Sequence, residues 1–434
     1  MFELIKVAVA LVSIILVYRV ITNNCNKYLA FAVLAIWLRY FSSGFHDITY
    51  SPIVAGFSIN ALISICIAGL GLIVIPKSVL ALKKLISFYF LFAAIAVSGF
   101  VNMEITGTIN VLVKWCYFLV LASCIFLSIR VQGRNDTFRK LLIAFFMPVM
   151  LQILSILLGH VKATEADGSA SYIGGYSHEA AFSMIIVAFI FCIGLIERNH
   201  LRFRTTLFTL AFVLLILVNY RTAILTVLPL SAVFYFTLVE QRLKPTQKAP
   251  VLTVVAMVLF LVFVSLSITM QDRFADVGYL VTNLDLIFKA PEYFTENEQD
   301  IMSARVYIWS KYINEFMNAN SINMLLGFGP ESWSKKFTLY AHNTYVSNLY
   351  ELGLIGFVCF LLMLINTLIL GFSMKEKRLA KIVGFSIIGF ATMNIATMPL
   401  WNIEGLIFFA VIVGTIFASR SSSGAIYKVD RQPN

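Results

Sequence analysis

The sequence is poor in charge. Only 13% of its 434 residues are Asp, Glu, Lys or Arg, whereas 60% are hydrophobic. Soluble domains carry about 25% charged and about 45–50% apolar residues. Apolar runs of about 20 residues, long enough to cross a hydrocarbon core of roughly 30 Å as a helix, recur along the chain. We therefore expect an all-α polytopic membrane protein, and a soluble globular domain is excluded.

Cysteine is also scarce. The chain has six cysteines, and none of them falls in the long stretch 271–344 that separates two groups of apolar runs. Disulfides therefore cannot staple this stretch, which must be held by packing and by the membrane surface. The expected organisation is a first group of ten spans in 1–270, a large loop over 271–344, and three further spans with a short tail in 345–434.

About thirteen apolar segments are predicted to span the membrane. The first is expected to be a retained span, because Met1-Phe2-Glu3 lacks the basic segment that opens a signal peptide. Around Asn219, apolar runs meet with no real loop, so a tight turn and a broken helix are both open. The predicted spans lie near 3–20, 28–43, 52–75, 85–101, 109–128, 140–158, 179–196, 205–220, 222–238, 250–270, 345–371, 380–398 and 402–419.

Basic residues concentrate in alternate connections between these spans. With thirteen spans all the basic connections fall on one side, which the positive-inside rule assigns to the cytoplasm together with the C-terminus. The net charge of +11 is then a topology signal, and no nucleic-acid partner is expected. The opposite, periplasmic side receives the N-terminus and the segments 44–51, 102–108, 159–178 and 271–344.

Motifs for metal and nucleotide chemistry are missing from that periplasmic side. It has no Asp-x-Asp pair, no Gly-Lys-Ser phosphate loop and no His/Cys zinc spacing. This argues against sugar transferases that depend on a divalent metal. We expect a site without metal or cofactor that is lined by cations.

Two arginines are present where the positive-inside rule disfavours them. Arg221 in "NYRTAIL" starts a span, where a guanidinium costs roughly 2.5–3.5 kcal/mol at full depth. It is either an interfacial anchor or part of an anion site at a helix N-terminus. Arg305 belongs to "QDIMSARVYIWSKYINEF", which has the apolar spacing of an amphipathic helix at the membrane surface. It is either a snorkelling charge or a group that closes a site from above.

A lone histidine lies at the same rim. "LLGFGP" predicts a helix end and a glycine-proline turn, and the next helix begins after His342 with Asn343 or Thr344 as its cap. The position of His342 among small and polar residues favours a functional role over a structural one. His178, with Glu179, is either a helix cap or a sugar contact.

These motifs resemble the bacterial O-antigen ligase and polysaccharide polymerase superfamily, integral membrane glycosyltransferases of the GT-C type. The resemblance covers roughly 172–358. It rests on Arg221 in "NYRTAIL", on Arg305 in "SARVYIW", and on "LLGFGPESW" followed by "HNTYVSNLYELGLIG". In the last motif the matching positions are Gly327, Gly329, His342, Asn343, Glu351, Gly353 and Gly356.

The resemblance implies a substrate and a place. The donor would be a glycan on undecaprenyl diphosphate, used at the periplasmic face of the bacterial inner membrane among its lipids. The acceptor would be a second lipid-linked glycan in a polymerase or lipid A-core in a ligase, and a chain-length regulator is a further partner to consider. The acceptor attacks the anomeric carbon and the lipid diphosphate leaves.

This chemistry suits the residues. Planar arginine forks bind phosphate oxygens, so Arg221 and Arg305 are assigned to the diphosphate. His342 is either the base for the acceptor hydroxyl or a diphosphate ligand, and the base is favoured. Glu351 is expected to be a buried structural group. Further contacts to diphosphate or glycan are assigned to His178, Lys335, Lys336, Asn343 and Tyr345, and Trp333 and Tyr340 are stacking or interfacial aromatics.

Three alternatives stay open. Polymerisation into O-antigen or exopolysaccharide is favoured over ligation, but the motif serves both. A transporter or flippase for the same lipid-linked sugar would show internal repeats and ionisable residues deep in several spans, which the sequence does not display. A purely structural membrane partner would leave the arginines and His342 unexplained.

Overall fold

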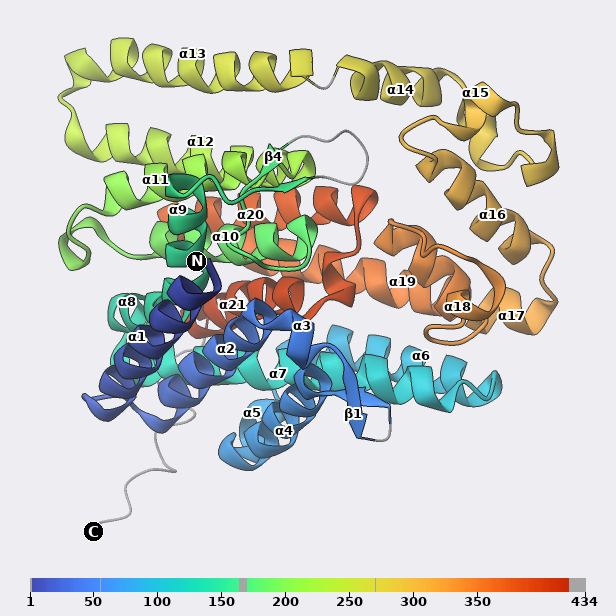
Figure 1. Cartoon of the computed structure of the whole chain (residues 1–434), viewed down its shortest axis with the longest axis horizontal. Helices are drawn as coiled ribbons and strands as arrows, with labels where there is room; N and C mark the ends of the chain where they lie inside the picture. Colours follow the sequence, from blue (N-terminus) through green and yellow to red (C-terminus); the bar gives the residue numbers. More distant parts are fainter. Residues whose placement is uncertain (1, 55, 164–169, 270, 421–434) are drawn as a thin grey trace.

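The computed structural model describes residues 2–54, 56–163, 170–269 and 271–420, and its regular structure is almost entirely helical. Figure 1 shows the helices gathered into one bundle, with α14 to α18 beside it. This confirms the predicted all-α class. The α-helices are α1 (Phe2–Thr22), α2 (Lys27–Gly44), α3 (His46–Thr49), α4 (Ile59–Val74), α5 (Lys77–Leu80), α6 (Ile86–Val101), α7 (Ile105–Gln132), α8 (Arg134–Leu141), α9 (Phe146–Leu157), α10 (Glu179–Leu195), α11 (Arg204–Leu217), α12 (Arg221–Arg242), α13 (Pro245–Thr269), α14 (Gln271–Thr282), α15 (Glu296–Gln299), α16 (Arg305–Met317), α17 (Ser321–Leu326), α18 (Trp333–Lys336), α19 (Thr344–Phe372), α20 (Lys377–Ala396) and α21 (Ile403–Arg420).

Short elements join these helices. Two small antiparallel hairpins pair β1 (Pro52–Val54) with β2 (Phe57–Ser58) and β3 (Lys162–Ala163) with β4 (Ala170–Ser171). The 3₁₀-helices are η1 (Lys83–Leu85), η2 (Leu142–Phe145), η3 (Arg198–His200), η4 (Leu284–Ile287), η5 (Pro291–Tyr293) and η6 (Pro399–Trp401).

Each predicted span contains a helix, and α8, η2 and α9 together fill 140–158. The predicted start of 52–75 is wrong, because the β1–β2 hairpin occupies its first residues and α4 begins only at Ile59. Within the described residues, eight helical stretches are long and apolar enough to cross a membrane. Four shorter apolar helices match four more predicted spans, namely Ile59–Val74, Glu179–Leu195, Arg204–Leu217 and Ile403–Ser419. The remaining predicted span, 28–43, corresponds to α2. The multi-pass character is thus confirmed, whereas the number thirteen and the GT-C type stay predictions.

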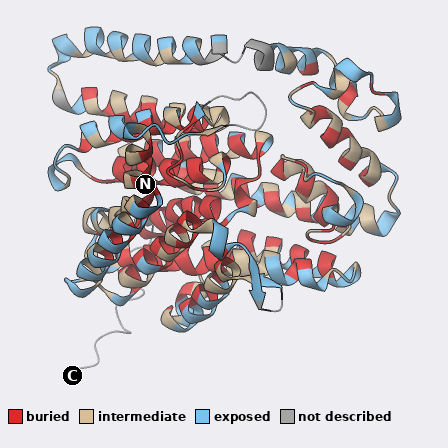
Figure 2. Cartoon of the chain, in the orientation of Figure 1, coloured by how far each residue is buried: buried red, intermediate tan, exposed pale blue. Residues whose placement is uncertain are grey.

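The core lies along α7, α10 and α21, which are apolar around most of their circumference and buried on most sides. Phe118 of α7 stacks on Phe409 of α21 with ring centroids 5.2 Å apart. At the edge of the bundle, α13 leaves large apolar side chains such as Phe260 exposed (Figure 2). An exposed apolar face is what a helix in contact with lipid presents.

The segments predicted on one side of the membrane meet at one end of the bundle. Phe2 stacks on His160 with ring centroids 4.1 Å apart. The side-chain amide of Asn102 donates to the carbonyl of Gly327 at 2.9 Å. We call this end, which also carries α14 to α18, the loop end.

The segments predicted on the other side meet at the opposite end. Lys140 donates to the carbonyl of Asn24 at 2.7 Å. Arg134 forms ion pairs with both Glu197 and Glu376. The alternation predicted from charge is therefore reproduced by contacts between loops. The predicted cytoplasmic tail, 421–434, lies outside the described residues.

Packing holds the long segment at the loop end. All six cysteines of the chain are free. The predicted amphipathic helix is α16, which buries Val306, Trp309 and Phe316. Val306 and Trp309 join an apolar cluster with Leu286 of η4, so the two parts of the loop share a small core of their own.

Candidate active site

His342 lies in the turn before α19, and its backbone is fixed from both sides. The side-chain oxygen of Asn343 accepts hydrogen bonds from the backbone N–H groups of Tyr345 (2.9 Å) and Val346 (3.2 Å), which confirms the predicted helix cap. On the other side, the indole N–H of Trp309 donates to the carbonyl of Ala341 at 2.9 Å. The half-buried imidazole is thus held by α16 and by the start of α19.

Two cationic or potentially cationic side chains act on His342. Burial, and after it the charges of Arg305 and His178, together lower the pKa of His342 to about 4. These residues come from the N-terminal ends of α16 and α10. The structure therefore brings three of the predicted site residues together, around an imidazole that is neutral at pH 7.

His178 is confirmed in one of the two roles considered for it, that of a helix cap, and its contact with a sugar stays a prediction. It is the N-cap of α10, and its Nδ1 accepts a hydrogen bond from the backbone N–H of Ala180 at 3.1 Å. In the neutral ring the proton is then assigned to Nε2. Its side chain is exposed and lies within electrostatic reach of His342.

Arg221 reaches the same region through its neighbour Tyr220. Tyr220 is the N-cap of α12, and Arg221 is the first residue of that helix, where the helix dipole is positive. Burial raises the pKa of Tyr220, a hydrogen bond with Thr397 and the charge of Arg305 lower it, and the charge of Glu179 raises it. The N-terminal ends of α10, α12 and α16 therefore converge on Tyr220.

The backbone is strained at each of these approaches. Asn219 has a φ of 59°, and His342 itself has a φ of 49°. Met302, Ser303 and Ala304, which lead into Arg305, have φ values of 53°, 55° and 62°. A non-glycine residue in this region costs about 1 kcal/mol or more, and such residues cluster at functional sites. The turn at Asn219 also shows that 205–238 forms two helices with a tight turn between them.

Aromatic rings form a wall beside His342. Tyr340 lies 4.0 Å from His342 and 5.4 Å from Trp401, centroid to centroid. Trp333 packs edge-on against Tyr340 at 5.9 Å and Trp401 at 5.7 Å. We call Trp333, Tyr340 and Trp401 the aromatic wall. On its other side, the ammonium of Lys114 lies 5.1 Å from the Trp401 ring.

Other predicted contact residues are engaged elsewhere. Lys335 forms an ion pair with Glu104 at 2.5 Å, and Lys336 pairs with Glu315 at 3.1 Å. The hydroxyl of Tyr345 donates to the carbonyl of Ala391 in α20 at 3.0 Å. These contacts do not bring the three side chains to His342, so their role in binding stays a prediction, as does that of the capping residue Asn343.

Glu351 and the motif glycines build the support under the site. The two carboxylate oxygens of Glu351 accept hydrogen bonds from the hydroxyl of Ser347 (2.9 Å) and the backbone N–H of Glu331 (3.0 Å). Gly353 has a φ of 66° and interrupts α19, and a Cβ there would lie 2.4 Å from the backbone nitrogen of Gly327. The motif therefore encodes a close backbone contact between the turn after α17 and α19.

Sequence reasoning missed three residues near the site, namely Tyr220, Thr397 and Trp401. Tyr220 directly precedes Arg221, so a ring next to a membrane-rim arginine was the available signal. Thr397 and Trp401 lie in "ATMPLWNIE", between two predicted spans, and the proline and tryptophan at that rim were the only hint. Thr397 and Trp401 follow His342 by more than 50 residues, so the sequence alone does not indicate that Thr397 lies at Tyr220 and Trp401 at Tyr340.

A comparison with known families bears on this region. Residues 205–361 match the model of the family described as O-antigen ligase. The match runs from α11 into α19 and contains Arg221, Arg305 and His342, so the predicted resemblance is confirmed over this part of the chain. No curated protein matches the sequence.

The matched segment, 205–361, does not supply every side chain at the site. His178 precedes it, and Thr397 and Trp401 follow it. Among the described residues, no three or more His, Cys, Asp or Glu side chains lie together as they would to hold a metal ion. The side chains gathered at the site include Arg305, the imidazole of His342 and the hydroxyl of Tyr220.

Proposed function

We propose that the protein transfers a glycan from a lipid diphosphate carrier, undecaprenyl diphosphate, to a second lipid-linked glycan, so that repeat units are polymerised into O-antigen or exopolysaccharide. The loop end would face the periplasm of a bacterial inner membrane. The observation that carries the proposal is that the charges of Arg305 and His178 act on a neutral His342, while the same Arg305 also acts on Tyr220, next to Arg221.

Charge is the first argument. When the glycosidic bond breaks, negative charge grows on the departing diphosphate, and fixed donors aimed at that charge lower the barrier. Arg305 and Arg221 are each the first residue of a helix, where the helix dipole adds to the guanidinium charge. We assign the diphosphate to these two helix ends.

The proton is the second argument. A hydroxyl of the acceptor sugar attacks the anomeric carbon, the bond from that carbon to the diphosphate oxygen breaks, and the oxygen keeps the electron pair. His342 takes the hydroxyl proton. In the free protein its pKa of about 4 makes it a weak base. A bound diphosphate adds negative charge beside the ring and raises that pKa, so the base becomes stronger when the donor is in place.

Ligation is the second candidate, because the matching family is described as O-antigen ligase. In that case the acceptor would be lipid A-core, and the same residues would act on the same donor. The two reactions differ in the acceptor, which makes the acceptor the variable to test.

The test uses purified protein in detergent with a lipid-diphosphate-linked repeat unit, with and without lipid A-core. The products of wild type, Arg221→Ala, Arg305→Ala and His342→Ala are resolved on a gel. A ladder from the repeat unit alone, lost in the variants and unchanged by EDTA, is expected for the polymerase. A single shifted band that needs lipid A-core would identify the ligase. Binding of the lipid without any transfer would refute both and favour a transporter.

A further inference from the structure

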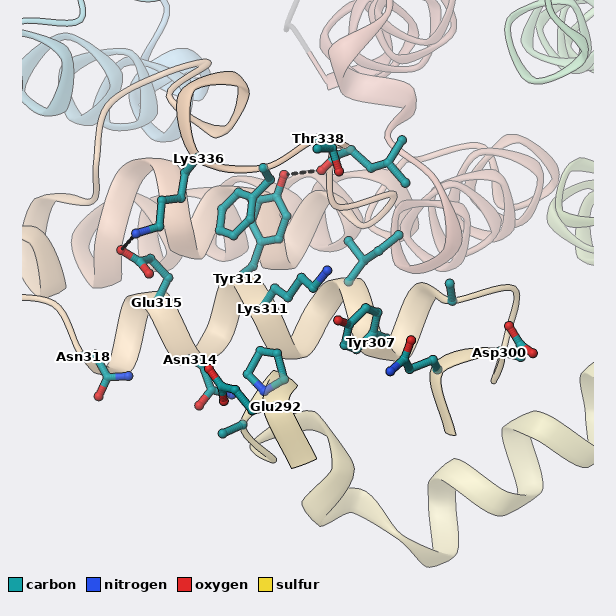
Figure 3. A pocket seen from close by; sticks show the side chains of 17 residues that line it. Glu292, Asp300, Tyr307, Lys311, Tyr312, Asn314, Glu315, Asn318, Lys336 and Thr338 are labelled. Carbon is teal, nitrogen blue, oxygen red and sulfur yellow. Dashed lines mark hydrogen bonds and ion pairs between the residues drawn. The ribbon is translucent and has the colours of Figure 1, made fainter. Parts of the chain in front are cut away.

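A cavity at the loop end lies across α16. It has a volume of about 630 Å³ and is formed by three segments, namely α16 itself, 336–339 and 290–300. Figure 3 shows Lys336 and Thr338 on one side of the helix and Glu292 on the other. Its lining follows α16 from Ala304 to Asn318, which corresponds to roughly 20 Å at about 1.5 Å per residue. We call this cavity the α16 groove.

The walls of the groove are tied to its floor. The hydroxyl of Tyr312 donates to the carbonyl of Leu339 at 2.9 Å, and Glu315 pairs with Lys336, so α16 holds the 336–339 wall at two points. The side-chain amide of Asn314 donates to the carbonyl of Lys289 at 3.0 Å and holds the opposite wall. The groove is therefore a built feature of the fold.

The lining carries the groups that bind sugars. Carboxylates, an amide and a hydroxyl are exposed along it, at Glu292, Asp300, Asn318 and Thr338. The half-buried ring of Tyr307 adds an aromatic surface, with the ammonium of Lys311 4.0 Å from its centre. Pockets that bind small molecules in this size range combine apolar or aromatic surface with a few fixed polar groups.

The charge of the groove differs from that around His342. Two ammonium groups, on Lys311 and Lys336, face three carboxylates, on Glu292, Asp300 and Glu315. Cations therefore do not exceed anions along the groove, and a chain of acidic sugars would meet repulsion rather than attraction. Uncharged sugars carry no such penalty.

The groove starts where the proposed active site ends. Ala304, at one end of the lining, directly precedes Arg305, and Leu339 lies three residues before His342. We propose that the α16 groove binds an extended stretch of uncharged sugars, the part of a glycan that lies beyond the sugar next to the diphosphate. This inference rests on the proposed function, because it takes the diphosphate to lie at Arg305.

The first test measures glycan binding without lipid, diphosphate or catalysis. The full chain in detergent carries Thr338→Cys, at an exposed lining position, or Ser334→Cys, an exposed position in α18 outside the lining. The rate of labelling at that cysteine by a maleimide is followed by peptide mass spectrometry. The probes are the glycan released by mild acid from the lipid-linked intermediates of the source cells and an oligogalacturonate of matched length.

The released glycan is expected to slow labelling of Thr338→Cys several-fold and to leave Ser334→Cys unchanged, whereas the oligogalacturonate changes neither. Equal labelling of Thr338→Cys with and without saturating glycan would overturn the proposal. Protection by the oligogalacturonate to the same degree would overturn the assignment to uncharged sugars.

A second variant separates this inference from the proposed function. Asn318→Trp places a bulky ring at the far, exposed end of the groove. We expect a KM for the lipid-linked repeat unit raised several-fold with kcat little changed, because the groove binds the ground state and the transition state alike. An unchanged KM would contradict the groove and leave the diphosphate site standing. Loss of glycan protection in Arg305→Ala would contradict the separation of the two sites.

Discussion

The two sides of the aromatic wall place positive charge next to different groups. On the side of Lys114, the cations are neutralised, because Lys114 pairs with Glu331 at 3.1 Å and Arg39 pairs with the buried Glu404 at 2.8 Å. On the side of His342, Arg305 and His178 lower the pKa of the imidazole, which reports a positive local potential. The cations on the Lys114 side thus act on carboxylates, whereas the charges on the other side act on the imidazole of the proposed base.

The largest expected effect on activity is that of replacing Arg305, compared with a cation that is paired elsewhere in the same loop segment. Arg305→Ala should lower kcat/KM about 10²–10³-fold, the usual cost of removing one donor to a developing oxyanion. Arg305→Lys should recover part of the loss, because the charge returns without the planar fork. The matched control is Lys289→Gln, which removes a cation paired with Glu298 at 2.7 Å in the same loop segment. A similar loss in both variants, measured by single-turnover kinetics, would remove the contrast.

His342 gives the second contrast, through pH. The neutral ring is the active form, and the free protein has a pKa of about 4 at this position, so kcat/KM should fall only as the pH approaches 4. The bound diphosphate raises that pKa, so kcat should begin to fall at a higher pH. His342→Gln should lower kcat about 10²-fold or more and abolish this difference. Identical pH profiles for the two parameters in wild type would argue against the base.

Gly353 tests the support beneath the site. Gly353→Ala places a Cβ at a φ of 66° and 2.4 Å from the nitrogen of Gly327, so we expect a loss of about 1–3 kcal/mol in the free energy of unfolding. Gly69→Ala in α4 meets nothing within 4 Å and should be neutral or stabilise by up to about 1 kcal/mol. Denaturation in detergent compares the two. If the Gly353→Ala and Gly69→Ala variants were equally stable, the turn at Gly327 would be able to shift away from the added Cβ.

The smallest expected effect, on both stability and kcat, is that of replacing Lys114. Its ion pair with Glu331 is partly exposed, with side chains 21% and 22% accessible, and such pairs contribute about 0–1 kcal/mol. Lys114→Met should therefore change stability by less than about 1 kcal/mol and leave kcat within a few-fold of wild type. A loss of kcat as large as that of Arg305→Ala would show that both sides of the wall bind the substrate.

Much of the fold could be predicted because the membrane imposes it. Each predicted span contains a helix, although 52–75 starts with the β1–β2 hairpin. The loops that the charge alternation assigns to one side meet, as Lys140 does with Asn24 at one end and Gly327 with Asn102 at the other. The cap at Asn343 followed from local sequence, since its side chain can satisfy the first N–H groups of α19.

Less of the site could be predicted because it depends on contacts between distant segments. Arg305 and His342 were named from their place at the rim, but their common electrostatic environment with His178 came from the packing of three helix ends. Tyr220 and Thr397 were missed for the same reason. Lys335 was named from its charge, and only the fold shows that Glu104 pairs with it.

The central claim is that the residues around His342 bind the lipid diphosphate. Calorimetric titration of the purified protein with undecaprenyl diphosphate at pH 5.5, in buffers of different ionisation enthalpy, measures the protons taken up on binding. We predict uptake of a large part of one proton in wild type, because the diphosphate raises the pKa of His342 from about 4. Uptake should disappear in His342→Gln while binding persists. Binding without proton uptake in wild type, or the same uptake in His342→Gln, would contradict the account.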